Sequence, residues 1–221
     1  MGLSRGVWRA MACCRPSETA TGWIVIVLTA LMMAVSNLAT VFSVEYLVRL
    51  KFHLVQLAVD HDGVAYGILV LLGLMAGLAL LGALLVHGLA PDAGGSGSPE
   101  NKAWLNGFGA EAKKVFAART LLVRFLAVIL SNATGYPCGR EGPTVTLGSG
   151  VAYLWCRCIS ARHKEAKEYL DMRSGAPGAV RMGCIVGGAC GMAMIFNSPV
   201  GGILYMCLYS VQKLIVDENG C

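Results

Sequence analysis

Residues 139–143 read Gly-Arg-Glu-Gly-Pro and place one carboxylate, Glu141, between two glycines in a chain with the composition of a membrane protein. A charge at the bilayer centre costs about 2.5–3.5 kcal/mol, whereas one helix N-terminus returns about 0.3–1 kcal/mol to a nearby anion. Several helix ends or hydroxyls must therefore converge on a buried, ionised Glu141. A site that stabilises a carboxylate in this way also holds a free anion, so the pentapeptide predicts an anion path.

The composition places the chain in the integral-membrane class. Of the 221 residues, 56% are hydrophobic and 14% charged, and the mean hydropathy is +0.62. The 28 glycines suit helices that pack closely, break inside the membrane or expose backbone amides to a ligand. We predict an all-α, multi-pass integral membrane protein. The net charge of +5 fits the positive-inside bias rather than nucleic-acid binding.

Two apolar stretches, at about 23–50 and 64–89, are each long enough to cross a hydrocarbon core of about 30 Å. We predict a cytoplasmic arm over residues 1–20 and a membrane domain over residues 21–221. Between the two spans, we expect a solvated polar connection, formed by Arg49, Lys51, His53, Asp60, His61 and Asp62.

Shorter apolar segments follow, at about 119–134, 143–156, 180–196 and 199–216, and Gly, Pro and Asn separate them. Interrupted segments of this kind predict discontinuous helices whose ends form the binding site. Gly183, Gly187 and Gly191 recur at four-residue intervals and predict a flank where another helix packs closely. The cysteines fit small packing residues, and their spacing predicts neither a metal site nor a cofactor.

Three interruptions contain the candidate site residues, at 94–100 (GGSGSPE), 139–143 (GREGP) and 196–202 (FNSPVGG). The first two open helices with a proline near the first turn, and their glycines let bare amides face an anion. The candidate anion-binding residues are Ser96, Gly97, Ser98, Gly139, Arg140 and Gly142. Arg140 either raises the local positive potential or faces water at a helix end. Glu100 fits a carboxylate favoured by the helix dipole or paired with a cation.

These residues resemble the chloride channel and transporter (CLC) family, whose hallmark sequences are GSGIP, GREGP or GKEGP, and GxxxGMAxxFNxPxGG. The chain reads GSGSPENKAWLNG at 95–107, GREGP at 139–143 and GGACGMAMIFNSPVGG at 187–202. The resemblance covers roughly residues 20 to 216. It implies the first half of an inverted repeat built from discontinuous, tilted helices, with chloride as the transported ion.

The resemblance also implies roles for single residues. Ser96 matches the serine whose hydroxyl coordinates the permeant anion, where a proline goes with nitrate preference in some relatives. Glu141 matches the gating glutamate, which occupies an anion site until it is protonated or displaced. Tyr209 stands where the family's exchangers carry an inward-facing glutamate that takes up protons. Because no carboxylate is there, a voltage-gated chloride channel gated by Glu141 is favoured over a chloride/proton antiporter.

The chain ends at Cys221, after what resembles the first half of the family fold, and has no paired CBS domains. We therefore expect a fragment, an incomplete gene model or a truncated relative, acting as a homodimer or beside a full-length relative. A non-conducting regulatory partner is the alternative from a different functional class. An enzyme is not expected, because the sequence has no GxxxxGK[ST] phosphate loop and no HExxH motif.

Overall fold

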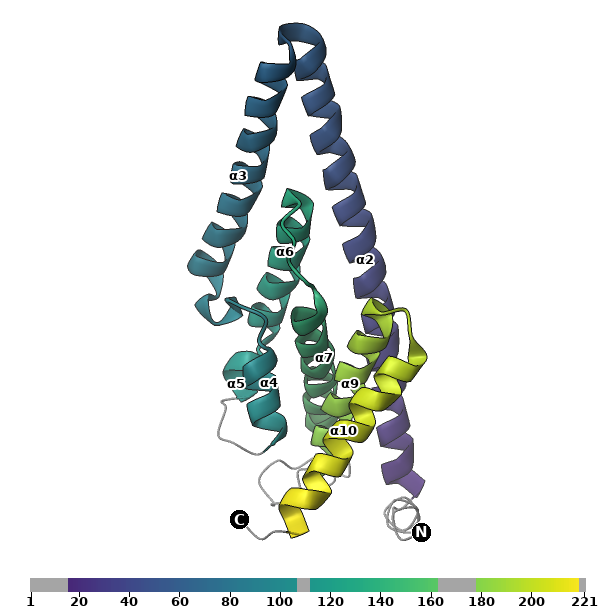
Figure 1. Ribbon diagram of the computed structural model, residues 1–221. Helices are drawn as coiled ribbons and strands as arrows, with labels where there is room; N and C mark the ends of the chain where they lie inside the picture. Colours follow the sequence, from purple (N-terminus) through teal and green to yellow (C-terminus); the bar gives the residue numbers. More distant parts are fainter. Residues whose placement is uncertain (1–15, 107–111, 163–177, 219–221) are drawn as a thin grey trace.

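The computed structural model describes residues 16–106, 112–162 and 178–218, and every regular element in these ranges is a helix (Figure 1). The all-α fold class is thereby confirmed. Most of the predicted arm, and the C-terminal residues from 219, lie outside the described ranges. The elements are α2 (Pro16–Asp62), α3 (Val64–Leu89), the 3-10 turn η1 (Pro91–Ala93), α4 (Ser98–Leu105), α5 (Ala112–Val115), α6 (Ala118–Thr134), α7 (Glu141–Arg162), α9 (Gly178–Ile195) and α10 (Pro199–Glu218).

The helices α2 and α3 form a long hairpin that projects beyond the other helices (Figure 1). Two segments, Gly22–His61 and Val64–Leu89, are long and apolar enough to cross a membrane, and most of their large side chains are exposed. Exposed apolar side chains on such helices suit contact with lipid.

The polar connection expected over residues 49–62 is wrong, because α2 remains helical through Asp62 and only Gly63 separates it from α3. A helix pairs its own backbone groups, so charged side chains on its exposed faces do not interrupt it. Lys51 is also not solvated: only 6% of it is exposed.

The shorter helices begin close to the glycine and proline interruptions. α4 begins at Ser98 with Gly97 as its N-cap, α7 begins at Glu141, and α10 begins at Pro199. Figure 1 shows that α2 begins and α10 ends at the same end of the bundle, away from the α2–α3 turn.

The pair α7 and α9 packs most extensively, and glycines set the closeness of this contact. A methyl group on Gly148 would overlap the carbonyl oxygen of Gly187, and one on Gly187 would overlap that of Gly148. On Gly191 it would lie 2.7 Å from the carbonyl oxygen of Thr144, whereas on Gly183 it would meet Cys156 Sγ at an ordinary 3.5 Å. Gly187 and Gly191 therefore lie where the two backbones approach most closely.

An aromatic cluster fixes the short helix α4 against α7. The ring of Trp104 meets the ring of Phe116 edge to face with centroids 5.3 Å apart, and the ring of Tyr153 at 6.0 Å. Phe116 and Tyr153 are buried in the same apolar core. Aromatic pairs of this geometry contribute about 0.5–1.5 kcal/mol beyond their buried area. The cluster therefore sets where the N-terminus of α4 stands relative to α7.

Gly187→Ala tests the close contact of α7 and α9. The added methyl overlaps a backbone carbonyl, and overpacking of this kind costs about 1–3 kcal/mol, so the thermal unfolding temperature in detergent should fall. Gly77→Ala on α3 is the matched control, because its methyl meets no atom within 4 Å. It should be neutral or slightly stabilising. Equal shifts for both variants would contradict the close approach.

Candidate functional site

The turn before α4 presents Ser96, Gly97 and Ser98 together. Gly97 adopts a left-handed conformation with φ of 66°, which a residue with a side chain rarely takes, and its carbonyl accepts the amide of Asn101. The amide of Ser98 donates to the hydroxyl oxygen of Ser96 over 3.2 Å. Since no side chain of the N-cap residue covers the N-terminus of α4, its first amides stay directed along the helix axis.

The first turn of α7 packs directly on this turn. A methyl on Gly142 would lie 2.7 Å from Ser96 Cβ, so only glycine allows the two backbones to come this close. The buried hydroxyl of Thr146 lies 3.2 Å from the carbonyl oxygen of Ser96 and 3.0 Å from that of Gly142. Two sequence motifs about 45 residues apart along the chain thus form one structural unit.

Glu141 is the first residue of α7 and is half-buried. Its carboxylate folds back over Gly139, where any side chain would overlap it. The charge therefore stands at a helix N-terminus, where the dipole and the unpaired amides favour an anion. The next residue, Gly142, is the one that touches Ser96, so Glu141 and the 96–98 turn are adjacent.

Arg124 on α6 is a member of this site that the sequence reasoning missed. It is only 3% exposed, and its Nη2 donates to the carbonyl oxygen of Asp92 over 3.0 Å. A methyl on Gly97 would overlap the guanidinium group, so the charge lies directly behind the 96–98 turn. The Nε and Nη1 atoms have no hydrogen-bond partner among the residues that the structure describes, and Glu100 acts on the group electrostatically. A cation inside an apolar run was the available signal.

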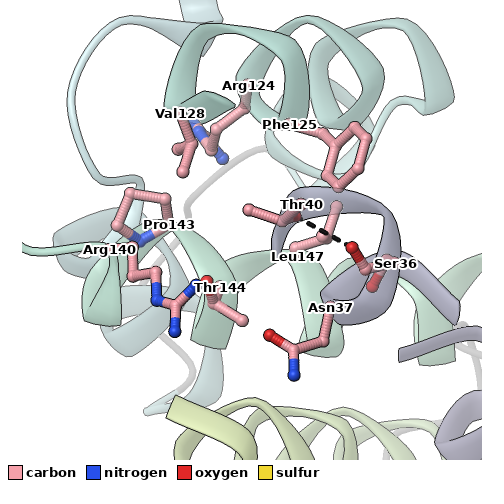
Figure 2. A pocket seen from close by; sticks show the side chains of 10 residues that line it. All are labelled: Ser36, Asn37, Thr40, Arg124, Phe125, Val128, Arg140, Pro143, Thr144 and Leu147. Atoms are coloured by element: carbon pink, nitrogen blue, oxygen red, sulfur yellow. Dashed lines mark hydrogen bonds between the residues drawn. The ribbon is translucent and has the colours of Figure 1, made fainter. Parts of the chain in front are cut away.

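Arg140 brings a second guanidinium close to the first. It is half-buried and lines a cavity of about 20 Å³ between α2, α6 and α7. Figure 2 shows Arg124 of α6 and Arg140, which precedes α7, approaching this cavity, with Ser36, Asn37 and Thr40 of α2 on the opposite wall. Two cations near residues 139–143 raise the electrostatic potential there, which favours anions.

Lys51 anchors the segment that leads to Glu141. Its ammonium donates to the carbonyl oxygens of Ala133 at 3.0 Å and Thr134 at 3.1 Å, in the last turn of α6. A cation at a helix C-terminus pairs the last carbonyls and complements the dipole. Lys51 therefore holds in place the end of α6 from which residues 135–140 lead to α7.

The structure does not bring every predicted residue to this site. Tyr209 lies on α10 with its ring against that of Tyr205, the centroids 4.6 Å apart. Gly183, Gly187 and Gly191 lie along the α9 contact described above. Ser96, Gly97, Ser98, Gly139, Glu141 and Gly142 come together, with Arg124 and Arg140 beside them.

Comparison with known proteins gives consistent relatives. The family described as voltage gated chloride channel matches residues 77–208. "Chloride channel protein clh-3" of Caenorhabditis elegans is 34% identical over 83% of this chain and 17% of its own length. "Chloride channel protein CLC-b" of Arabidopsis thaliana is 33% identical over 80% of the chain and 22% of its own length. "H(+)/Cl(-) exchange transporter 7" of Bos taurus is 30% identical over 83% of the chain and 23% of its own length. The chain spans about a fifth of these relatives.

Lys51→Met should lower stability. The substitution keeps the apolar stem but leaves two buried carbonyls unpaired, and each unsatisfied buried group costs about 1–3 kcal/mol. Arg49→Met is the matched control, because Arg49 forms only an exposed pair with Glu45 on the same helix, a type of pair that contributes little. Thermal unfolding in detergent measures both variants. An unfolding temperature for Lys51→Met equal to that of Arg49→Met would show that the buried pairing contributes nothing.

Proposed function

Because the chain belongs to the voltage gated chloride channel family, whose members are integral membrane proteins that move anions, we propose that it moves chloride across a membrane along a path gated by Glu141. The contact of Gly142 with Ser96 supports this most directly. It sets a carboxylate beside a serine hydroxyl and two helix N-termini, which is a site where chloride and the carboxylate compete.

The charges around the site support anion rather than cation transport. Arg124 is buried behind Gly97, and Arg140 precedes Glu141, so two fixed cations face one gating carboxylate. When Glu141 occupies the helix end, its charge compensates theirs. When Glu141 is protonated or swings away, the same positive potential attracts a chloride ion.

We place the working unit in an assembly, either two copies of the chain or this chain with a longer relative. One helix end stabilises an anion by about 0.3–1 kcal/mol, which is less than the cost of a buried charge. The ends of α4 and α7 supply two such contributions among the described residues. Further amide or hydroxyl donors then come from the partner.

Passive conduction is favoured over coupled exchange because Tyr209, and no carboxylate, stands at the inward position. Exchange is the second candidate, and it is favoured by one observation: the hydroxyls of Tyr209 and Tyr205 form a hydrogen-bonded pair inside the bundle. The relatives include both kinds of protein by name, a chloride channel protein and an H(+)/Cl(-) exchange transporter.

Glu141→Gln tests the gate. The amide resembles a protonated carboxyl, so chloride efflux from liposomes containing the 221-residue chain should be high at every pH. Efflux through the unaltered chain should rise as the pH falls, because protonation removes the competing charge. A proton ionophore, added or omitted, separates conduction from exchange.

Glu45→Gln is the matched control, since Glu45 is exposed on α2 and pairs with Arg49. Its efflux should follow the unaltered chain. Efflux through Glu141→Gln that keeps the original pH dependence would contradict the gating role. No efflux from the folded, unaltered chain would contradict transport by this chain alone and favour the regulatory partner.

Ser96→Pro tests the anion-binding turn. Loss of the serine hydroxyl should shift relative permeability from chloride toward nitrate by roughly tenfold or more, because a hydrogen bond to a charged group contributes about 1.5–3 kcal/mol. Ser131→Ala is the matched control: it removes a serine hydroxyl on α6, away from the 96–98 turn, and should leave the ratio of nitrate to chloride permeability unchanged. Competition between the two anions in the efflux assay gives the ratio. An unchanged ratio in Ser96→Pro would place Ser96 outside the path.

A further inference from the structure

The small cavity between α2, α6 and α7 lies on the side of α7 that faces away from α4. Three residues of α7 line it: Pro143, Thr144 and Leu147. Three others meet the 96–98 turn or α4: Gly142, Thr146 and Ser149. Because successive residues of a helix turn by about 100°, the two sets point in roughly opposite directions from the axis of α7. The cavity is therefore separate from the site beside Ser96.

Two guanidinium groups border this cavity. Arg124 is only 3% exposed, and Arg140 is half-buried. Among the residues that the structure describes, neither forms an ion pair, and Arg124 Nε has no hydrogen-bond partner. Glu100 acts on Arg124 electrostatically without pairing with it, and the carboxylate of Glu141 folds over Gly139. Two positive charges inside a membrane domain are costly unless an anion lies near both.

Asn37 of α2 adds a neutral donor on the opposite wall. The neighbouring hydroxyls donate within α2, that of Ser36 to Met33 at 2.9 Å and that of Thr40 to Ser36 at 2.8 Å, so their protons are in use. The half-buried Asn37 amide donates to no residue that the structure describes. Figure 2 shows Asn37, Arg124 and Arg140 around the cavity, each from a different segment. These three side chains supply N–H donors and two positive charges.

The cavity has room for one small particle. Its volume is about 20 Å³, and a cavity needs about 10–15 Å³ to hold one water molecule. Phe125, Val128 and Leu147 supply apolar walls, which strengthen the attraction between an ion and the guanidinium groups. A monoatomic anion suits these limits, whereas polyatomic anions such as sulfate are too large. A water molecule fits by size but brings no charge to offset the two cations.

We propose that a halide ion, chloride in the cell, resides in this cavity as the counter-ion of Arg124 and Arg140, with the Asn37 amide as its third ligand. The ion joins α2 to α6 and to the segment that leads into α7. It is therefore part of the folded structure and not the ion in transit. This resident ion goes beyond the proposed function and does not require that the chain transports chloride.

Thermal unfolding of the 221-residue chain in detergent tests the resident ion. Sodium chloride or sodium bromide replaces sodium gluconate at constant ionic strength, because gluconate is too large for the cavity. A ligand that binds the folded chain stabilises it, so a hundredfold rise in free halide above the dissociation constant should raise the unfolding temperature by roughly 5–10 °C. Calorimetric titration with chloride counts the ions bound per chain.

Asn37→Asp is the decisive variant, because it places a carboxylate where the ion is proposed to lie. The carboxylate compensates both guanidinium groups, so the unfolding temperature should be high without halide and should no longer depend on it. Calorimetry should count one chloride ion fewer per chain. Asn106→Asp is the matched control, since Asn106 ends α4 outside the cavity. It should keep the full halide dependence.

Asn37→Leu is the second variant, because it removes the amide and keeps the approximate volume of the side chain. Loss of a hydrogen bond to a charged group should weaken halide binding by about tenfold or more. If this variant does not fold, Asn37→Asp decides alone, because its fixed carboxylate replaces the ion.

An unfolding temperature of the unaltered chain that does not respond to halide would overturn the resident ion. Full halide dependence and an unchanged ion count in Asn37→Asp would also overturn it, and would leave only water in the cavity. The two proposals fail separately. Halide dependence that disappears in Asn37→Asp, without any chloride efflux from liposomes, would refute transport by this chain and keep the resident ion. Efflux controlled by Glu141, with full halide dependence in Asn37→Asp, would refute the resident ion and keep the gate.

Discussion

Helix ends that lie inside a membrane must be paired by the protein itself, because lipid offers no hydrogen-bond partner. Three long-range contacts meet this constraint here. Lys51 caps the end of α6 from 82 residues away, Arg124 bonds the carbonyl of Asp92, and Thr146 bonds that of Ser96. The amide of Ser98 already donates to the Ser96 hydroxyl, so the donors that the two N-termini offer are the other first-turn amides of α4 and α7. The site is therefore built from free donors, while the neighbouring acceptors are already occupied.

The same contacts favour an anion over a cation at this site. Each acceptor is paired by a cation or a hydroxyl, so satisfying the backbone also brings positive charge to the site. Arg124 uses one nitrogen for Asp92 and leaves Nε and Nη1 unpaired beside Gly97. An excess of buried donors is costly in an apolar interior unless an anion or a dipole compensates it. In the proposed function, Glu141 and a chloride ion are alternative ways to supply that compensation.

The sequence predicted the helix starts and the 96–98 and 139–143 turns well, since glycine and proline act on the local backbone. The sequence predicted poorly the burial and the partners of residues whose contacts come from distant segments of the chain. Lys51 was expected in a solvated polar connection. The helix α2 continues through these charged residues, and the face that carries Lys51 contacts α6. Arg124 lies inside the apolar run at 119–134, and the sequence alone does not show that it packs behind Gly97. The link between Asn101 and Ser149 joins residues 48 positions apart, and no local pattern marks it.

The tyrosine at position 209 bears on the difference between conduction and exchange. A glutamate carboxylate, with an ordinary pKa of about 4.3, exists in a charged and a protonated form and so can store a proton, whereas a tyrosine hydroxyl, with an ordinary pKa of about 10, only passes one on. Strict exchange requires a fixed ratio between the protons and the chloride ions that cross the membrane. In the proposed function, a chain with tyrosine rather than a carboxylate at position 209 has no storing group there that would fix a ratio of protons to chloride.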